Sequence, residues 1–344
     1  MENLEDMEAS TDAFATNSLL RVQIGNGIHR SQFLRILILD NVDIHALPTL
    51  PKSLINLQVS ILWMDTFPDL SNLINLEKMD LSFGQPHSDM ISNGLGEHPM
   101  PEWFGELSKL KFLALHSHHG TTSPTNLTLP PRLKSLHLKC PNLRCLPRLP
   151  LSLSSLKLEE CWSLCSMEDL SNLKELSSLH ISSAAIAEIQ GLGCLENLRD
   201  LHLYWLGQVK ILPDLSNLNK LTSLLVGYCD ELVEIQGQLP RFLDFFRVDD
   251  CGSLQKLPDL SSLMDFEQLQ ILPDLSNSNQ LRRLLVHRCD NLVEIQGELP
   301  QSLEVLHIES CKSLQKLPNV SSSTRLQEVC IRDCNDLVEI QGVA

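Results

Sequence analysis

Histidines recur at matching places in a pattern that the chain repeats every 20 to 23 residues over most of its length. His137, Lys157, His180 and His202 occupy the fifth position of this pattern, and Asp200 lies two residues before His202. If each repeat forms one strand of a sheet, these side chains stand about 4.8 Å apart, which is close enough to share a metal ion. The alternative is a row of solvated polar side chains on a binding surface. Because no further residues are placed to orient metal ligands, we predict the binding surface and no metal.

Cysteines form a second recurring set, and six of the eleven occupy one repeat position. These six are Cys161, Cys229, Cys251, Cys289, Cys311 and Cys334. A thiol is a small apolar group with a weak donor, which suits a crowded bend where a strand turns into a loop. Neighbouring repeats lie close enough for disulfides, but the odd number of cysteines and the lack of a secretory signal favour reduced thiols. The closest pairs lack the C-x-x-C spacing of zinc sites, so we predict no structural metal.

Motifs that would support catalysis are absent from the sequence. It contains no G-x-x-x-x-G-K-[ST] phosphate loop, no G-x-G-x-x-G turn, no G-x-S-x-G nucleophile and no H-E-x-x-H metal site. We therefore predict that the protein is not an enzyme and needs no cofactor.

The repeats that position these residues are clearest where the chain contains one stretch twice. Residues 213–262 and 273–322 align without gaps, and 30 of these 50 pairs are identical. Each copy contains the pattern L-x-x-L-x-L-x-x-C, as in Leu221 to Cys229 and Leu243 to Cys251. This is the leucine-rich repeat, with cysteine where asparagine is more usual. Its apolar fourth and sixth positions alternate with variable residues, which predicts a short strand with one buried face.

These repeats predict an α/β leucine-rich-repeat solenoid, with a curved parallel sheet on its concave face and irregular loops with short helical or extended segments on its convex face. Residues 34–344 would form one domain of about 14 repeats, after a poorly ordered lead-in at residues 1–33. Two repeats depart from the usual length, through an insertion at 84–101 and a shortened repeat at 263–280. The predicted repeats begin at Leu34, Leu54, Leu76, Leu110, Leu133, Leu153, Leu176, Leu198, Leu221, Leu243, Leu263, Leu281, Leu303 and Leu326.

Composition and charge exclude several classes of partner. The 344 residues are 43% hydrophobic but only 5% aromatic, so leucine must fill the core. A formal charge of -16 argues against nucleic acid and acidic membrane surfaces, which select an excess of lysine and arginine. The longest apolar run falls far short of the roughly 20 residues that a membrane span needs. Residues 1–18 carry five acids and no base, unlike a signal peptide, so we expect a cytoplasmic or nucleo-cytoplasmic protein.

The two long copies differ mainly on one face. Nine of the ten outward strand positions differ between the copies, whereas the other 40 positions hold 11 differences. In the first copy the outward positions are Thr222, Ser223, Leu225, Gly227, Tyr228, Asp244, Phe245, Arg247, Asp249 and Asp250. Exposed convex residues such as Glu234, Gln236, Gln255 and Lys256 are unchanged. Free drift of exposed residues would not spare these positions. We interpret the pattern as a concave binding face whose chemistry has been varied.

Aromatic residues indicate where on this face a partner would bind. Tyr204 and Trp205 lie at the outward end of one predicted strand, and Tyr228 lies one repeat further on. Trp205 could instead turn into the core, as large aromatic side chains often do. The acidic residues Asp200, Asp249 and Asp250 would favour a basic partner. The predicted protein-binding residues are His180, His202, Tyr204, Trp205, Tyr228, Phe245, Arg247, Arg283, His287 and His307.

Three kinds of segment resemble the repeats of a known receptor family. They are the P-D-L-S-N segments (Pro68 to Asn72, Pro213 to Asn217, Pro273 to Asn277), the C-x-x-L-x-E-I-Q-G segments, and Met100 to Leu107. The chain is similar in these to plant intracellular nucleotide-binding leucine-rich-repeat disease resistance proteins, most closely those with a Toll/interleukin-1-receptor-type domain. The resemblance covers about residues 34–344.

The resemblance implies a non-catalytic recognition module of plant innate immunity. In that family the repeats sense a pathogen effector or a guarded host protein, or hold the receptor's nucleotide-binding domain inactive. This sequence carries neither the signalling nor the nucleotide-binding domain, so nucleotide binding is not expected here. The alternative is a generic intracellular adaptor, such as the substrate-binding part of a ubiquitin ligase.

Overall fold

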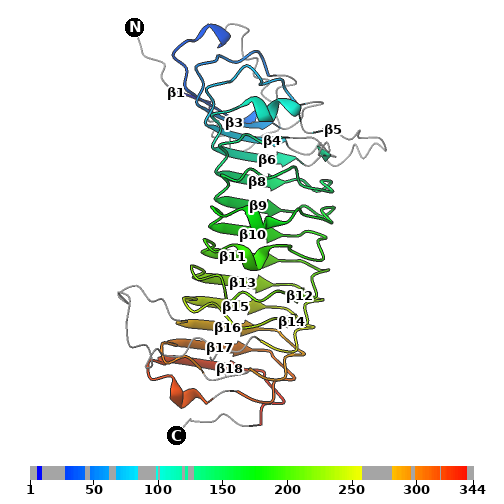
Figure 1. The fold of residues 1–344 in the computed structure, drawn as a ribbon, viewed down its shortest axis with the longest axis vertical. Coiled ribbons are helices and arrows are strands. Elements are labelled where there is room, and N and C mark those ends of the chain that lie inside the picture. Colours follow the sequence, from blue (N-terminus) through cyan, green and yellow to red (C-terminus); the bar gives the residue numbers. More distant parts are fainter. Residues whose placement is uncertain are drawn as a thin grey trace, which may run out of the picture. The chain divides into compact units, whose positions relative to one another are not determined.

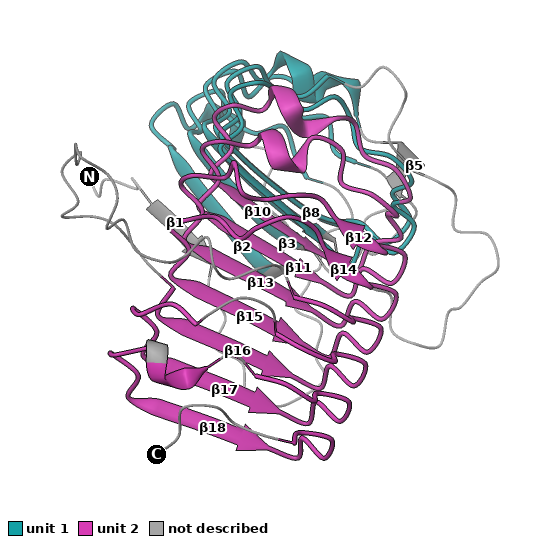
Figure 2. Cartoon of the chain, turned by 60° about the horizontal axis from the view of Figure 1, so that its bottom comes forward, with its two compact units in different colours: residues 1–164 teal, residues 165–344 magenta. Residues whose placement is uncertain are grey.

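The repeats fold into a parallel-sheet solenoid, in agreement with the prediction from sequence (Figure 1). The structure is a computed structural model, and it describes residues 6–9, 28–42, 47–61, 67–83, 98–99, 101–117, 121–122, 128–257, 281–295, 299–317 and 319–338. The chain divides into two compact units, residues 1–164 and 165–344 (Figure 2). The shortened repeat predicted at 263–280 lies outside the described residues, as do most of the lead-in at 1–33 and most of the insertion at 84–101.

Unit 1 contains a sheet whose parallel strands follow one another in chain order. Its strands are β1 (Asp6–Ala9), β2 (Ile36–Val42), β3 (Asn56–Ile61), β4 (Lys78–Phe83), β6 (Phe112–Ser117), β8 (Ser135–Lys139) and β9 (Ser155–Glu159). A separate short pair joins β5 (His98–Pro99) to β7 (Thr121–Thr122). The 3₁₀ helices of this unit are η1 (Ile28–Arg30) and η2 (Glu102–Glu106).

Unit 2 repeats the same arrangement. Its sheet strands are β10 (Ser178–Ser182), β11 (Asp200–Tyr204), β13 (Ser223–Gly227), β15 (Phe245–Asp249), β16 (Arg283–His287), β17 (Val305–Glu309) and β18 (Glu328–Arg332). Away from the sheet, β12 (Ile211–Leu212) pairs with β14 (Glu234–Ile235). The 3₁₀ helices are η3 (Leu170–Asn172), η4 (Leu192–Cys194) and η6 (Val320–Ser322). Among the described residues, no helix combines the length and the apolar character needed to cross a membrane.

The core is a stack of aligned aliphatic side chains. In β13, Leu224 and Val226 point into the core and are buried, whereas Ser223 and Leu225 are half-buried. The parallel register sets Leu224 beside Leu201 of β11 and Phe246 of β15. Because neighbouring repeats share the same pattern, each inward side chain packs against an apolar side chain of the next strand. This explains how the core is filled with so few aromatic residues.

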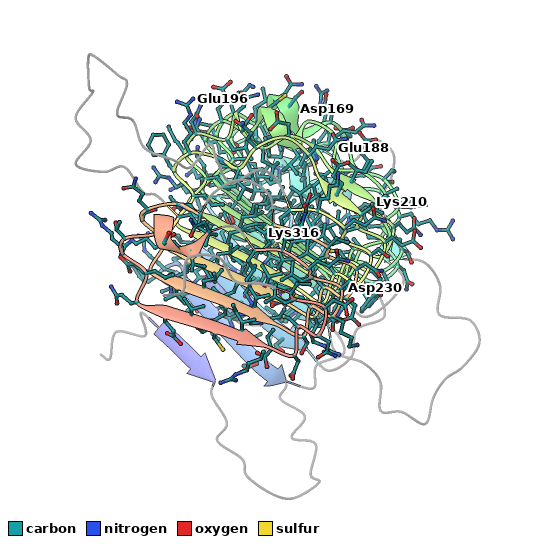
Figure 3. The ribbon with its side chains drawn as sticks, turned by 90° about the horizontal axis from the view of Figure 1, so that it is seen from below. Asp169, Glu188, Glu196, Lys210, Asp230 and Lys316 are labelled. Atoms are coloured by element: carbon teal, nitrogen blue, oxygen red, sulfur yellow. The ribbon has the colours of Figure 1, made fainter. Side chains whose placement is uncertain are left out.

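The P-D-L-S-N segments are turns that direct a leucine inward. The carboxylate of Asp69 accepts a hydrogen bond from the N–H of Ser71 at 3.0 Å, and Asp214 accepts one from Ser216 at 2.9 Å. In the related segment Glu168 to Asn172, Asp169 accepts a hydrogen bond from the N–H of Ser171 at 2.8 Å. Figure 3 labels Asp169 beside the short helix η3. The cap satisfies a backbone donor that the short helix leaves open and lets Leu170 enter the core. The motif that carries the family resemblance thus has a structural role.

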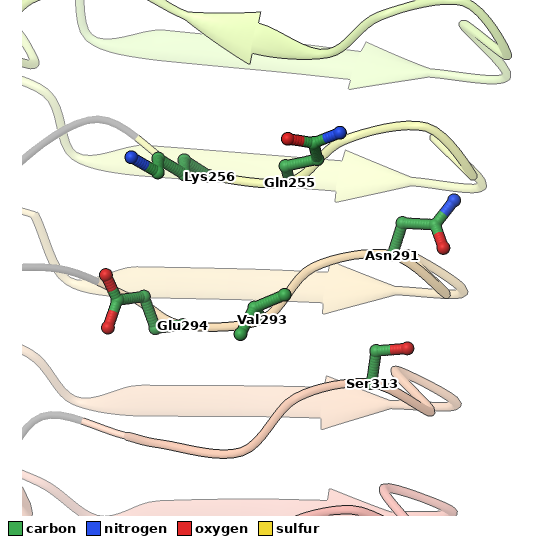
Figure 4. A pocket seen from close by; sticks show the side chains of 6 residues that line it. All are labelled: Gln255, Lys256, Asn291, Val293, Glu294 and Ser313. Atoms are coloured by element: carbon green, nitrogen blue, oxygen red, sulfur yellow. The ribbon is translucent and has the colours of Figure 1, made fainter.

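The side of unit 2 opposite the sheet carries a second ladder, which we call the back ladder. Beyond β14, bridges continue from Glu234 to Lys256, from Lys256 to Glu294, and from Glu294 to Lys316. Acidic and basic residues therefore alternate from turn to turn, and Figure 4 shows Lys256 and Glu294 on neighbouring turns beside a shallow hollow. Opposite charges facing one another across strands are stabilising. Because Glu234 and Lys256 and their counterparts Glu294 and Lys316 all belong to this ladder, a structural role accounts for their retention. The retention is therefore not by itself evidence that the sheet was varied for binding.

The recurring cysteines lie at the bend that follows each strand. All eleven cysteines are in the thiol form, and those at the bends of unit 2 between residues 229 and 311 are buried. The thiol of Cys229 donates to the carbonyl of Gly227 at 3.3 Å, and that of Cys251 to Asp249 at 3.4 Å. In unit 1, burial raises the pKa of the Cys161 thiol to about 11. Because reagents have little access to buried thiols, the buried bend cysteines serve as packing groups.

Thiol labelling should separate these classes of cysteine. In native protein a maleimide is expected to modify the exposed Cys165 and Cys194 first, and in denaturant it should modify all eleven cysteines. Mass spectrometry of labelled peptides gives both counts. Disulfide-linked peptides from natively prepared protein would contradict the assignment and indicate an oxidising compartment.

Candidate functional site

The ten predicted site residues all lie in unit 2, on the side of the sheet that faces away from the core or at the bends that follow it. We call this side the sheet face. Its members are His180 on β10, His202 and Tyr204 on β11, Trp205 and Tyr228 directly after β11 and β13, Phe245 and Arg247 on β15, Arg283 and His287 on β16, and His307 on β17. The structure divides them into an aromatic cluster, a charged region on β15 to β17, and the histidine pair His180 and His202.

The aromatic cluster consists of Tyr204, Trp205 and Tyr228. The rings of Trp205 and Tyr228 stack with their centroids 4.8 Å apart and their planes 13° apart. The Tyr204 ring lies 5.8 Å from that of Trp205. Trp205 is 51% exposed and Tyr228 is 38% exposed, so the alternative in which Trp205 enters the core is wrong. Phe245, at the other end of its strand, is separate from the cluster.

Trp205 and Tyr228 have left-handed backbone conformations, with φ of 51° and 54°. Their N–H groups donate to the carbonyls of Gly227 at 3.0 Å and Asp249 at 2.8 Å on the next turn, which fixes the corner. The same conformation recurs after other strands, and we call these eight residues the corner row. It consists of Glu160, Ser183, Trp205, Tyr228, Asp250, Arg288, Ser310 and Asp333.

The corner itself does not require aromatic residues. A left-handed conformation costs a residue with a side chain about 1 to 2 kcal/mol, and bulky residues adopt it rarely. Serine and aspartate occupy the neighbouring corners at Ser183 and Asp250. In the second long copy, Arg288 stands where the first has Tyr228. Two large exposed rings held in a strained backbone are therefore unexplained by folding alone, which points to a role in binding.

Gly227 gives the cluster its shape. A Cβ atom at Gly227 would lie only 2.6 Å from Cε1 of Tyr204, so the Tyr204 ring rests over this glycine. Gly227 is consequently buried, although the sequence placed it among the outward residues. Burial raises the pKa of Tyr204, and the nearby Asp249 carboxylate raises it further. The phenol therefore remains neutral and able to donate a hydrogen bond near neutral pH.

The acidic residues beside the cluster already have partners within the chain. Asp249 is only 8% exposed and accepts a hydrogen bond from Nε of Arg247, while Nδ1 of His287 lies 3.2 Å from its other oxygen. Asp250 forms an ion pair with Arg288 at 3.0 Å. The prediction that Asp249 would favour a basic partner was therefore wrong, because neighbouring side chains cover it and Arg247 balances its charge.

The rest of the charged region is similarly cross-linked between strands. Arg282 lies 3.2 Å from Asp244 and 3.9 Å from Glu304, and His307 lies 2.9 Å from Glu328. These pairs are partly solvated, so each contributes little to stability. They link the side chains of neighbouring strands from β15 to β18.

His180 and His202 lie in register on neighbouring strands, as predicted. Their ring centroids are 5.6 Å apart and the rings meet edge to face. Burial lowers the pKa of His202, although Asp200 opposes this shift, so His202 is neutral near pH 7. Across the described part of the chain, no group of three His, Cys, Asp or Glu side chains is placed to hold a metal ion.

A histidine network in unit 1 was missed by the sequence reasoning. Nε2 of His116 lies 3.2 Å from Nδ1 of His137, whose Nε2 lies 2.8 Å from the Glu159 carboxylate. His116 sits at the seventh repeat position and His137 at the fifth, with Ala114 in register beside His137. The small side chain of Ala114 leaves space for His116 to approach His137, and this diagonal contact is invisible to a search along one position.

Acidification is expected to weaken unit 1 through this network. Burial lowers the pKa of both His116 and His137; the surrounding charges are Asp80, Lys139, Lys157 and Glu159. An unfolded histidine titrates near pH 6.5. As the pH falls through about 6.5, the unfolded chain binds more protons than the folded chain, so the free energy of unfolding decreases.

Urea titrations at about pH 7.5 and pH 5 test this sign. A His116→Gln/His137→Gln variant should lose less stability on acidification than the wild type, whereas replacement of the exposed His29 by Gln controls for the loss of an imidazole. An equal fall in the wild type and the double variant would exclude the network as the cause.

Comparisons with known proteins identify solved structures of similar fold. No family model and no curated protein matches the chain. A leucine-rich-repeat protein of Leptospira interrogans is 18% identical, with 90% of this chain and 81% of that chain covered at a TM-score of 0.47. The leucine-rich effector YopM of Yersinia pestis is 17% identical, with 88% and 84% covered and a TM-score of 0.47. The ectodomain of the Arabidopsis thaliana receptor kinase GASSHO1/SCHENGEN3 is 15% identical, with 90% and 57% covered and a TM-score of 0.34.

Proposed function

We propose that the protein is a non-catalytic recognition module that binds a protein partner through the sheet face of unit 2. The aromatic cluster is the observation that carries this proposal, because its two exposed rings occupy strained corners that accept smaller residues elsewhere. Tyrosine and tryptophan dominate binding energy at protein interfaces. The paired charges of β15 to β18 would form the polar border around this centre.

The biological setting that we propose is plant innate immunity in the cytoplasm or nucleus. Support comes from the P-D-L-S-N, C-x-x-L-x-E-I-Q-G and Met100 to Leu107 segments that resemble plant intracellular immune receptors. The partner would be a pathogen effector, a guarded host protein or the nucleotide-binding domain of a receptor. Because the P-D-L-S-N turns also have a structural role, the support rests on the combination of segments.

Binding measurements with matched variants test the recognition surface. Tyr204→Ala and Tyr228→Ala should each weaken a protein partner about thirtyfold, the loss of about 2 kcal/mol typical of a central interface residue. Arg247→Ala should also weaken it, since Asp249 would lose its hydrogen-bond donor. Lys256→Ala on the back ladder is the control. Equal losses for Lys256→Ala and the sheet-face variants, with all proteins folded, would rule out this surface.

A further inference from the structure

We infer that the aromatic cluster takes a cationic side chain, arginine or lysine, from its protein partner. This inference rests on the proposed function and adds the chemistry of the contact. It begins from two other aromatic rings, one on a strand of each unit. Lys78 of β4 lies 5.1 Å over the ring of Phe112 on β6, and Arg283 of β16 lies 4.8 Å over the ring of Phe245 on β15. In both cases, a cation from the neighbouring strand covers the aromatic ring.

The stacked rings of Trp205 and Tyr228 lack such a cover. Their neighbours in the corner row are Ser183 on one side and Asp250 on the other, neither of which is cationic. Within the described residues, no lysine or arginine lies over either ring. Trp205 nevertheless remains 51% exposed. Tryptophan presents the most favourable ring face for a cation, so the cluster offers the contact that Phe112 and Phe245 already make.

The surrounding charge favours the same ligand. The chain carries a formal charge of -16, which attracts a basic partner over distance. At close range, Asp250 borders Tyr228 in the corner row, although it shares its charge with Arg288. Asp249 lies beside Gly227 in the strand register, but its charge is already balanced by Arg247, so it adds little to this attraction. An acidic anchor would be repelled by the net charge, and an aliphatic anchor would gain apolar contact but no cation–π attraction.

The stability of a Trp205 variant distinguishes a role of the ring in binding from a role in folding. The Trp205→Ser substitution removes the stacked ring. Serine already occupies two corners of the same left-handed conformation, at Ser183 and Ser310, so it should fit at this corner. If the ring serves binding, Trp205→Ser should leave the urea midpoint close to that of the wild type. Trp205→Phe, which restores a ring with a weaker face, should bind with intermediate affinity.

Selection from a displayed library of random 12-residue peptides tests the inference on the full chain. Peptides selected on the wild type should be enriched in arginine or lysine and should bind Trp205→Ser about tenfold more weakly, within the range of a cation–π contact. Replacing the selected arginine by neutral citrulline should cause a similar loss in the wild type and little further loss in Trp205→Ser. Ser310→Ala, in the same corner row, is the matched control.

The outcomes distinguish the inference from the proposed function. Peptides without basic enrichment, no recovered peptides, or equal affinity for wild type and Trp205→Ser would overturn the cationic contact. If selected peptides instead lose affinity with Arg283→Ala or His307→Ala, the sheet face remains a recognition surface and only the role of the cluster is rejected.

Discussion

Leu224→Ala is expected to lower the free energy of unfolding by about 2–5 kcal/mol, through the lost burial of three carbon atoms and the cavity that they leave. Leu224 is fully buried in β13 and stands in register between Leu201 and Phe246. Both neighbours are fixed by hydrogen-bonded strands, so they have little freedom to fill the cavity. The effect should therefore lie toward the upper part of this range. Urea titration followed by circular dichroism measures it.

Thr222→Ala provides the control for this prediction. Thr222 is two residues away and half-buried, and its hydroxyl donates to the carbonyl of Arg199 at 3.2 Å near the surface. Loss of such a solvated hydrogen bond should cost less than about 1 kcal/mol. Equal destabilisation by the two substitutions would mean that the register of β13 is wrong.

The core and the strands could be predicted from sequence because their signal is local and repeated. The L-x-x-L-x-L pattern fixes which residues of β13 face inward, and parallel stacking then sets each one beside its equivalent on the next strand. The prediction needed no knowledge of distant contacts. Each strand's nearest neighbours carry the same pattern, so one repeat describes the environment of the others.

The site was predicted less completely because its contacts differ from one turn to the next. Asp249 has the outward position of an exposed residue, but Arg247 on its own strand and His287 on the next strand cover it. Gly227 was placed outward correctly, yet the Tyr204 ring buries it. The left-handed corners of Trp205 and Tyr228 were missed because non-glycine residues give no local signal for positive φ. The only available indication in the sequence was that the residue at each bend differs from one repeat to the next.

Gly237→Ala should be the second strongly destabilising substitution, at about 2–3 kcal/mol. Gly237 belongs to the I-Q-G segment, and its φ of 73° costs a residue with a side chain about 1 kcal/mol. In addition, a Cβ atom there would lie 2.3 Å from both Cγ and Oδ1 of Asp214. The carboxylate would have to move and give up its 2.9 Å hydrogen bond from Ser216, a cap worth about 1 kcal/mol. Thermal or urea unfolding measures the sum.

A double-mutant cycle separates the two causes. Asp214→Ala alone should cost about 1 kcal/mol through the lost cap, but it also removes the atoms that a Cβ at residue 237 would strike. The double variant should therefore be more stable than the sum of the single losses predicts, by about 1 kcal/mol. Strict additivity would show that backbone strain alone makes Gly237 necessary. A positive coupling would establish that the P-D-L-S-N and I-Q-G segments of neighbouring turns are one structural unit, since the aspartate of one turn occupies the space that the glycine of the next leaves open.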